Sequence, residues 1–173
     1  PLKNLVDAVN VTDGPNANVH MSSIASSSIL QANNIEPIAQ FTCRDRNRIA
    51  LLSDLLGASA LGVHNLLILN GDDPTAGDQP EAKPVFDLQS HELINMAYKM
   101  TTQGIIPSKS VKVTDQGISA NTKSLKTPTS FFIGAADTPT SEYSEKWVQS
   151  IKKKNRAGAR FAQTQLCYDM NII

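Results

Sequence analysis

Two adjacent carboxylates follow an apolar segment in the sequence LLILNGDDP, which spans residues 66–74. Gly71 and Pro74 are sufficient to make a turn at this point, so the acids are not needed for that purpose. Asp73 directly precedes the proline and is interpreted as a turn residue. Asp72 is therefore a candidate functional carboxylate at the end of a predicted buried strand.

Hydrogen-bonding residues also end most of the other apolar segments. In parallel α/β folds the carboxyl ends of the strands share one edge, and ligands bind there. We therefore expect a ligand site built from strand ends. The residues at that edge would be Thr12 and Asp13, residues 42–45, residues 70–73, Asp137, and Thr164 with Gln165.

Several of these residues also have ordinary structural interpretations. Asp45 is expected to cap a helix, and Asp13, which precedes Gly-Pro, fits an Asx-turn. The lysines at 152–154 fit a solvated helix end, or a phosphate site if the fold is a barrel. Gln165 lies at an inward-alternating position of an apolar strand, and a buried amide needs partners for up to four hydrogen bonds. This favours a ligand-binding role for Gln165.

Short, nearly continuous apolar segments predict five strands, and these cover residues 7–12, 37–43, 65–70, 130–136 and 160–165. Helical patterns between them cover residues 21–34, 45–62, 87–104 and 140–158. In the second of these helices the residues that recur at helical spacing are Ile49, Leu52, Leu55 and Leu56. The regular alternation predicts a parallel α/β fold.

Two architectures fit this alternation, a doubly wound sheet and a (β/α)8 barrel. A dinucleotide-binding sheet needs G-x-G-x-x-G after its first strand, whereas VTDGPNANVHMSS at residues 11–23 contains one glycine. Two long segments interrupt the alternation and are expected to be functional or mobile. Residues 71–87 read as a loop rich in Pro, Gly and Asp, and residues 110–129 as a hairpin or a meander.

The chain of 173 residues is long enough for one domain, spanning 1–173. Sixteen Lys and Arg balance 16 Asp and Glu, which removes the electrostatic argument for nucleic acid or an anionic membrane. No segment approaches the roughly 18 to 20 apolar residues of a membrane helix, and no signal peptide is visible.

Cys43 and Cys167 fit neither a disulfide framework nor a metal site. We expect a soluble, cytoplasmic protein without a metal.

Several motifs occur in order along nearly the whole chain: DAVNVTD, MSSIASS, RDRNR, NGDDP, KPVFDL, FFIGAADTP and AGARFAQTQ. Together they resemble the methylenetetrahydrofolate reductase family, and its short form from anaerobic and acetogenic bacteria in particular. The combination of RDRNR, NGDDP and AGARFAQTQ is the most specific part of the resemblance.

The resemblance implies a (β/α)8 TIM barrel that carries a flavin at its C-terminal rim. This chain would supply about five of the eight strands, the second to the sixth. The family's general acid, a Glu on the first strand, would precede residue 1. The implied activity is the flavin-dependent reduction of methylenetetrahydrofolate to methyltetrahydrofolate, with FAD as the cofactor and FMN as the alternative. The implied electron donor is NADH or a ferredoxin- or NADH-linked electron-transfer subunit, in an oligomer or complex.

The resemblance also implies roles for individual residues. Asp72 would be catalytic, contacting flavin and pterin and stabilising a methylene-iminium cation as it forms. Gln165 would hydrogen-bond the pterin, Thr12 would lie beside the N5 region of the flavin, and Lys154 would lie near the flavin phosphates. The other implied cofactor-binding positions are Gln40, Leu69, Asn70, Gly71, Gly134 and Thr138. From their small size, Gly134 and Ala135 are expected to leave room at the rim for stacked rings.

Three of these positions differ from the well-studied bacterial form, which has His, Arg and His where this chain has Gln40, Asn70 and Thr138. Two other functions stay open at this point. One is a non-catalytic barrel subunit of an electron-transfer complex, and the other is a flavin reductase acting on another pterin carrier. Retention of the catalytic and pterin-binding positions argues against the first.

Overall fold

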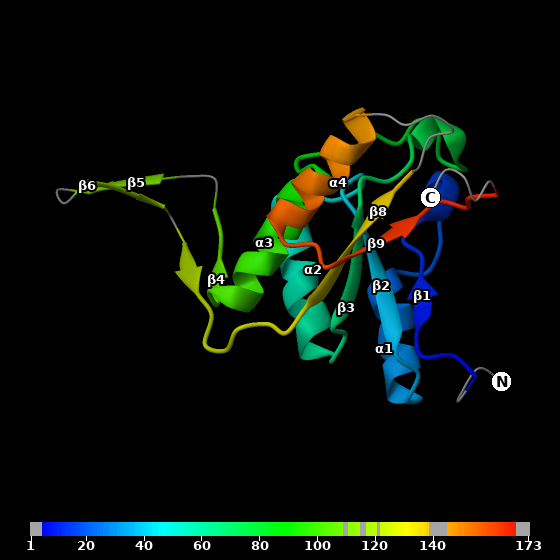
Figure 1. Ribbon diagram of the computed structural model, residues 1–173, viewed down its shortest axis with the longest axis horizontal. Helices are drawn as coiled ribbons and strands as arrows, with labels where there is room; N and C mark the ends of the chain where they lie inside the picture. The colour runs from blue at the N-terminus through cyan, green and yellow to red at the C-terminus, as the bar shows by residue number, and fades with distance from the viewer. Residues whose placement is uncertain (1–4, 109–110, 115–116, 121, 139–144, 169–173) are drawn as a thin grey trace.

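The computed structural model describes residues 5–108, 111–114, 117–120, 122–138 and 145–168. Its main sheet has five parallel strands in the order β1-β2-β3-β8-β9 (Figure 1). Their bounds are Val9–Val11, Pro37–Thr42, Asn65–Leu69, Phe132–Asp137 and Phe161–Thr164. Helices α1 to α4 alternate with them and cover Ser23–Ala32, Arg48–Ala60, Ser90–Thr102 and Glu145–Ala157.

The strand order decides between the two architectures that the sequence left open. A doubly wound sheet reverses its strand order and carries helices on both faces. Here the order follows the chain without reversal, the sheet curls, and the helices pack on one face (Figure 1). The fold is therefore α/β with five parallel strands in a curled half-barrel, as in part of a (β/α)8 TIM barrel.

The hydrophobic core lies between the sheet and the helices. Every second strand residue faces it because side chains alternate along a strand, and these residues are Ala39, Phe41, Leu66, Ile68, Ile133 and Ala135. Helix α3 contributes the largest helical share, namely Leu93, Ile94, Met96, Ala97 and Met100. The other strand residues point to the concave face of the half-barrel.

Helix α2 begins differently from the expectation. The side-chain oxygen of Asn47 accepts hydrogen bonds from the backbone N–H groups of Ile49 and Ala50, each at 3.1 Å. The prediction that Asp45 caps this helix is wrong, because its carboxylate instead binds the side chain of Arg44.

The buried face of α2 differs as well. Ile49 was expected on the apolar face, but it is 76% exposed. Leu52 and Leu56 are half-buried against the core. The fully buried stripe consists of Leu51, Leu55 and Ala58.

Antiparallel pairs form in the segment before β8. Strand β5 (Val111–Thr114) pairs with β6 (Gly117–Ala120), and β4 (Ile105–Ile106) pairs with β7 (Lys123–Ser124). The β5–β6 hairpin extends away from the sheet (Figure 1), which confirms the hairpin expected over residues 110–129. The start of the predicted helix over 140–158, up to residue 144, lies outside the described residues.

Two short 3-10 helices bring neighbouring loops into contact at the carboxyl ends of the strands. One, η1 (Pro15–Ala17), follows β1, and the other, η2 (Pro74–Ala76), follows β3. A Cβ atom added at Gly77 would lie 2.0 Å from the carbonyl oxygen of Ala17. The two loops therefore approach each other as closely as a glycine allows.

Gly77→Ala is expected to destabilise the protein by about 1–3 kcal/mol, because the new methyl group forces the backbone of the two loops apart. Gly57→Ala is the matched control, since a Cβ atom there would meet nothing within 4 Å. At this mid-helix position the control should stabilise the protein by about 0.5–1 kcal/mol. Urea unfolding of the full-length protein, followed by circular dichroism, measures both. Equal midpoints for the two variants would contradict the loop contact.

Candidate functional site

A row of paired residues, one from each of four neighbouring strands, crosses the concave face of the sheet. Gln40, Leu67, Gly134 and Phe161 are direct neighbours on β2, β3, β8 and β9. Leu67 is 1% exposed although it does not belong to the core under the helices, and Gln40 is half-buried. The structure thus brings two of the predicted cofactor-binding residues, Gln40 and Gly134, onto one row. Leu69 lies one row nearer the carboxyl end, opposite Thr42.

The space over Gly134 is filled. A Cβ atom at this position would lie 2.2 Å from the ring of Phe161, and that ring stacks on Phe132 with the centroids 5.2 Å apart. The expectation that Gly134 and Ala135 leave room for stacked rings is therefore wrong, since Ala135 is buried in the core under the helices. The missing side chain of Gly134 instead allows the aromatic ring of the adjacent strand to lie against the backbone of β8.

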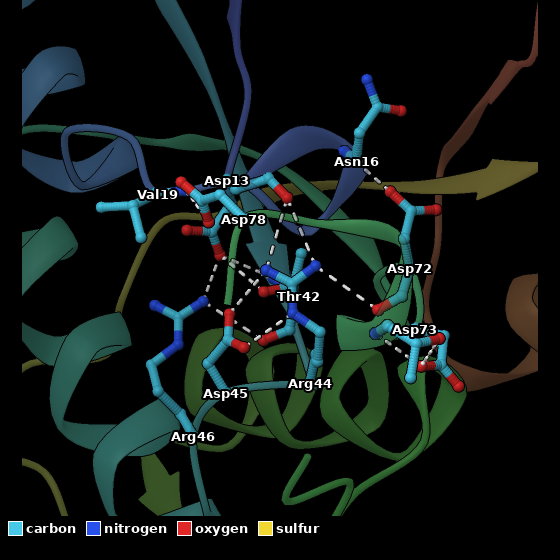
Figure 2. Close-up of polar contacts among 12 residues, drawn as sticks. Asp13, Asn16, Val19, Thr42, Arg44, Asp45, Arg46, Asp72, Asp73 and Asp78 are labelled. Carbon is cyan, nitrogen blue, oxygen red and sulfur yellow. Dashed lines mark hydrogen bonds and ion pairs between the residues drawn. The ribbon is translucent and has the colours of Figure 1, made fainter. Parts of the chain in front are cut away.

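Asp72 stands at the rim in the loop after β3 and is exposed. Its Oδ2 atom accepts a hydrogen bond of 3.0 Å from the backbone N–H of Asn16, in the loop after β1 (Figure 2). Within the described ranges its other oxygen has no protein partner. Asp73 accepts hydrogen bonds from the backbone and hydroxyl of Thr75, which lower the pKa of Asp73 and confirm it as a turn residue.

Arg44 connects three of the strand-end loops. It is 4% exposed, and its guanidinium donates to both carboxylate oxygens of Asp45 at 2.7 and 2.8 Å. The same group donates to the carbonyl oxygen of Gly14 at 3.3 Å and to that of Asp72 at 3.4 Å (Figure 2). The hydrogen bonds to Asp45 raise the pKa of Arg44 against the opposing effect of burial, and the charges of Asp45, Asp72 and Asp13 add to the rise.

Asp13 joins the end of β1 to the end of β2. Its Oδ2 atom accepts hydrogen bonds from the backbone N–H of Thr42 at 2.9 Å and from the Thr42 hydroxyl at 3.0 Å. It also forms an ion pair with Arg46 (Figure 2). Arg46 in turn binds Asp54 at 2.9 Å. The Asx-turn interpretation of Asp13 is wrong, because this carboxylate is bound to the neighbouring strand end.

Two further polar side chains, one after β3 and one at the start of α2, hold helices in place. The side-chain oxygen of Asn70 accepts a 2.8 Å hydrogen bond from the backbone N–H of Ser90, in the first turn of α3. The guanidinium of Arg48, at the start of α2, forms two hydrogen bonds of 2.7 and 2.5 Å with Asp87. Each arginine of RDRNR therefore has a different acidic partner.

Lys154 does not behave as a solvated helix end. Its ammonium donates to the carbonyl oxygen of Ala136 at 2.7 Å and to the carboxylate of Asp137 at 3.1 Å. Its side chain is 16% exposed, whereas Lys152 and Lys153 are exposed. The structure thus places Lys154 at the carboxyl end of β8, on the rim.

Some of the predicted site residues have no protein partner for their side chains in the described part of the chain. Thr12 and Gln165 are exposed, and Gln40 is half-buried. The premise that Gln165 is a buried amide is wrong, because this residue follows the edge strand β9. Thr138 is exposed, with its backbone N–H bound to the side chain of Asp137.

Cys43 follows Thr42 but is not a candidate nucleophile. Its side chain is fully buried, and this burial raises the pKa of the Cys43 thiol to about 12. A thiolate is the reactive form of cysteine. The thiol therefore acts as a core group.

Sequence reasoning missed Arg44 and gave Asp13 a local role only. The available signal was the position of RDRNR, a strongly charged segment directly after an apolar strand. A charge at such a position must find partners among the other strand ends, because leaving it buried without partners is costly. Pairing the three arginines with the acids of the neighbouring strand ends could have identified this network.

The concave rim fits a flavin in the chemistry of its groups. A flavin ring has apolar faces and hydrogen-bonding edges. Leu69, which is half-buried, supplies apolar surface on this face, and the side chains of Thr12 and Gln40 offer hydrogen-bonding groups that the described protein does not use. Among the described residues, no group of three or more His, Cys, Asp or Glu could hold a metal ion. In the same part of the chain, no helix has the length and hydrophobicity needed to cross a membrane.

Comparison with protein families agrees with this architecture. A family model described as methylenetetrahydrofolate reductase matches residues 2–173. A comparison with curated proteins gives no match. The family match covers nearly the whole chain, including all the strand ends described above, so the chain belongs to the methylenetetrahydrofolate reductase family.

Proposed function

We propose that the protein reduces methylenetetrahydrofolate to methyltetrahydrofolate in a flavin-dependent reaction, with FAD as the cofactor. Membership of the family supports the reaction. The observation that carries the proposal for this chain is Asp72, a rim carboxylate with one oxygen fixed by Asn16 and the other without a protein partner in the described residues. FMN is the alternative cofactor.

Asp72 has a defined task in this reaction. The five-membered ring of the substrate must open to an iminium ion as an acid protonates the leaving nitrogen, and a fixed carboxylate lowers the energy of the positive charge as it develops. The reduced flavin, when bound, supplies the hydride for the exposed methylene carbon. Because the backbone N–H of Asn16 holds one carboxylate oxygen at 3.0 Å, the charge of Asp72 is already in place before the ring opens.

The other rim residues would bind and orient the two rings. We propose that Gln165 hydrogen-bonds the pterin and that Thr12 and Gln40 bind the flavin, because their polar side chains have no partners among the described residues. Leu69, Asn70, Gly71 and Thr138 are the further proposed cofactor contacts. Lys154 can donate three hydrogen bonds, and the structure uses two of them. The third is left for a phosphate oxygen.

The electron donor and the assembly are part of the same proposal. We propose NADH, or a ferredoxin- or NADH-linked electron-transfer subunit, as the source of electrons, in a cytoplasmic oligomer or complex. The short form found in anaerobic and acetogenic bacteria is the proposed subtype. These assignments rest on the family and its chemistry.

Asp72→Asn should slow the oxidation of reduced flavin by methylenetetrahydrofolate by about 100-fold, because the neutral amide no longer stabilises the cation. Reduction of the flavin by NADH, or by the partner subunit, should change by less than about threefold, since no cation forms on folate in that step. Anaerobic stopped-flow absorbance of the full-length protein measures both half-reactions. Equal losses in the two would remove Asp72 from the catalytic role.

Gln165→Ala should raise the apparent KM for methylenetetrahydrofolate by about tenfold and leave kcat nearly unchanged, as expected for the loss of one hydrogen bond to the bound substrate. Steady-state kinetics of the full-length protein give both constants. A KM equal to that of the unmodified protein would take Gln165 out of the pterin site.

A further inference from the structure

The most heavily connected side chain of the rim is Arg44, which none of the functional assignments uses. Its guanidinium lies where the loops after β1, β2 and β3 meet (Figure 2). We propose that Arg44 is a positioning residue. It holds the Asp72 carboxylate in the position needed for catalysis, relative to the loop after β1 that carries Thr12. This inference rests on the proposed reductase function.

The contacts of Arg44 reach Asp72 by two routes. The first is direct, from the guanidinium to the carbonyl oxygen of Asp72 at 3.4 Å. The second passes through the loop after β1, because Arg44 binds the carbonyl oxygen of Gly14 and the backbone N–H of Asn16 in that loop holds the Asp72 carboxylate. Arg44 therefore fixes both the backbone and the side chain of Asp72.

Two glycines show how closely the loops are fitted around Arg44. A Cβ atom at Gly14 would lie 2.6 Å from a guanidinium nitrogen of Arg44, and one at Gly71 would lie 3.0 Å from the Arg44 Cβ. Both glycines have positive φ angles, 61° and 96°, which other residues rarely adopt. Gly14 comes two residues after Thr12, and Gly71 directly precedes Asp72, so Arg44 is packed between the two loops that carry site residues.

An arginine suits this position better than a lysine. The planar guanidinium can bind both oxygens of Asp45 and still donate to two carbonyl groups, whereas an ammonium is a compact point charge with three donors. Arg44→Lys keeps the charge but cannot maintain all of these contacts. A misplacement of about 1 Å in a catalytic group can cost about 100-fold in rate.

The test compares Arg44→Lys with the matched control Arg48→Lys, which changes another arginine of the same RDRNR segment. The control arginine pairs with Asp87 through side chains that are 35% and 25% exposed, and its guanidinium hydrogen bonds go to Asp87 rather than to Asp72 or Asp13. The flavin of each full-length variant is reduced with dithionite, which makes the result independent of the natural electron donor. Its oxidation by methylenetetrahydrofolate is then followed by stopped-flow absorbance.

Arg44→Lys should slow this oxidation by about 10- to 100-fold in the flavin-loaded protein. Its melting temperature should also fall below that of Arg48→Lys, because the lysine leaves some acceptors of the buried guanidinium unpaired. The control should react at the rate of the unmodified protein. A merely structural role would lower the melting temperature and flavin content without changing the rate of the loaded protein. Unchanged oxidation in Arg44→Lys, or equal losses in both variants, would overturn the inference.

Asp45→Asn provides a second variant should Arg44→Lys fail to fold. It removes the paired charge that holds the Arg44 guanidinium through two hydrogen bonds, and it leaves Asp72 and the proposed cofactor contacts unchanged. It should give the same selective loss of folate-driven oxidation, and a normal rate would overturn the inference. An unmodified protein that binds no flavin, or whose reduced flavin does not react with the folate, would overturn the proposed function itself.

Discussion

The burial of one positive charge is the constraint on which the rim depends. Arg44 is 4% exposed, and a charge in such a place is tolerated only when it is paired and fully hydrogen-bonded. Asp45 supplies the paired charge, and the carbonyl groups of Gly14 and Asp72 supply further acceptors. Because these acceptors belong to loops after three neighbouring strands, satisfying one guanidinium brings three strand ends together. The curl of the sheet places this cluster at the carboxyl edge, where barrels of this kind hold their ligands.

The polar residues of the rim divide into two groups according to their partners. Asp13 and Asn70 are bound within the protein, to the end of β2 and to the first turn of α3, so they build the rim. Thr12, which is exposed, and Gln40, which is half-buried, use no protein partner for their side chains among the described residues. Asp72 belongs to both groups, since one oxygen is fixed and the other is available. This division separates the residues that shape the site from those that a ligand can engage.

The alternation of apolar strands and amphipathic helices was sufficient to predict the strands and the parallel sheet, because both depend on local patterns. The roles of Asp13 and Asp45 could not be predicted, since an acid before a turn or a helix looks the same whether it binds its own backbone or an arginine. The cap on α2 shows the difficulty, because Asn47, two residues later, takes the role that Asp45 also fits. The space at Gly134 depends on the register of β9, which places Phe161 opposite it. The partners of these acids and the register of β9 are set by contacts between segments far apart in the sequence, so no local sequence pattern predicts them.

The most direct test of the account is an anaerobic titration of the purified full-length protein, followed by its visible absorption spectrum. We expect a bound flavin whose absorbance is lost on reduction and returns when methylenetetrahydrofolate is added, with methyltetrahydrofolate as the product. The spectrum thus reports both cofactor binding and transfer to the folate. A protein that binds neither FAD nor FMN when they are supplied, or whose reduced flavin is not oxidised by the folate, would contradict the assignment of the rim as a reductase site.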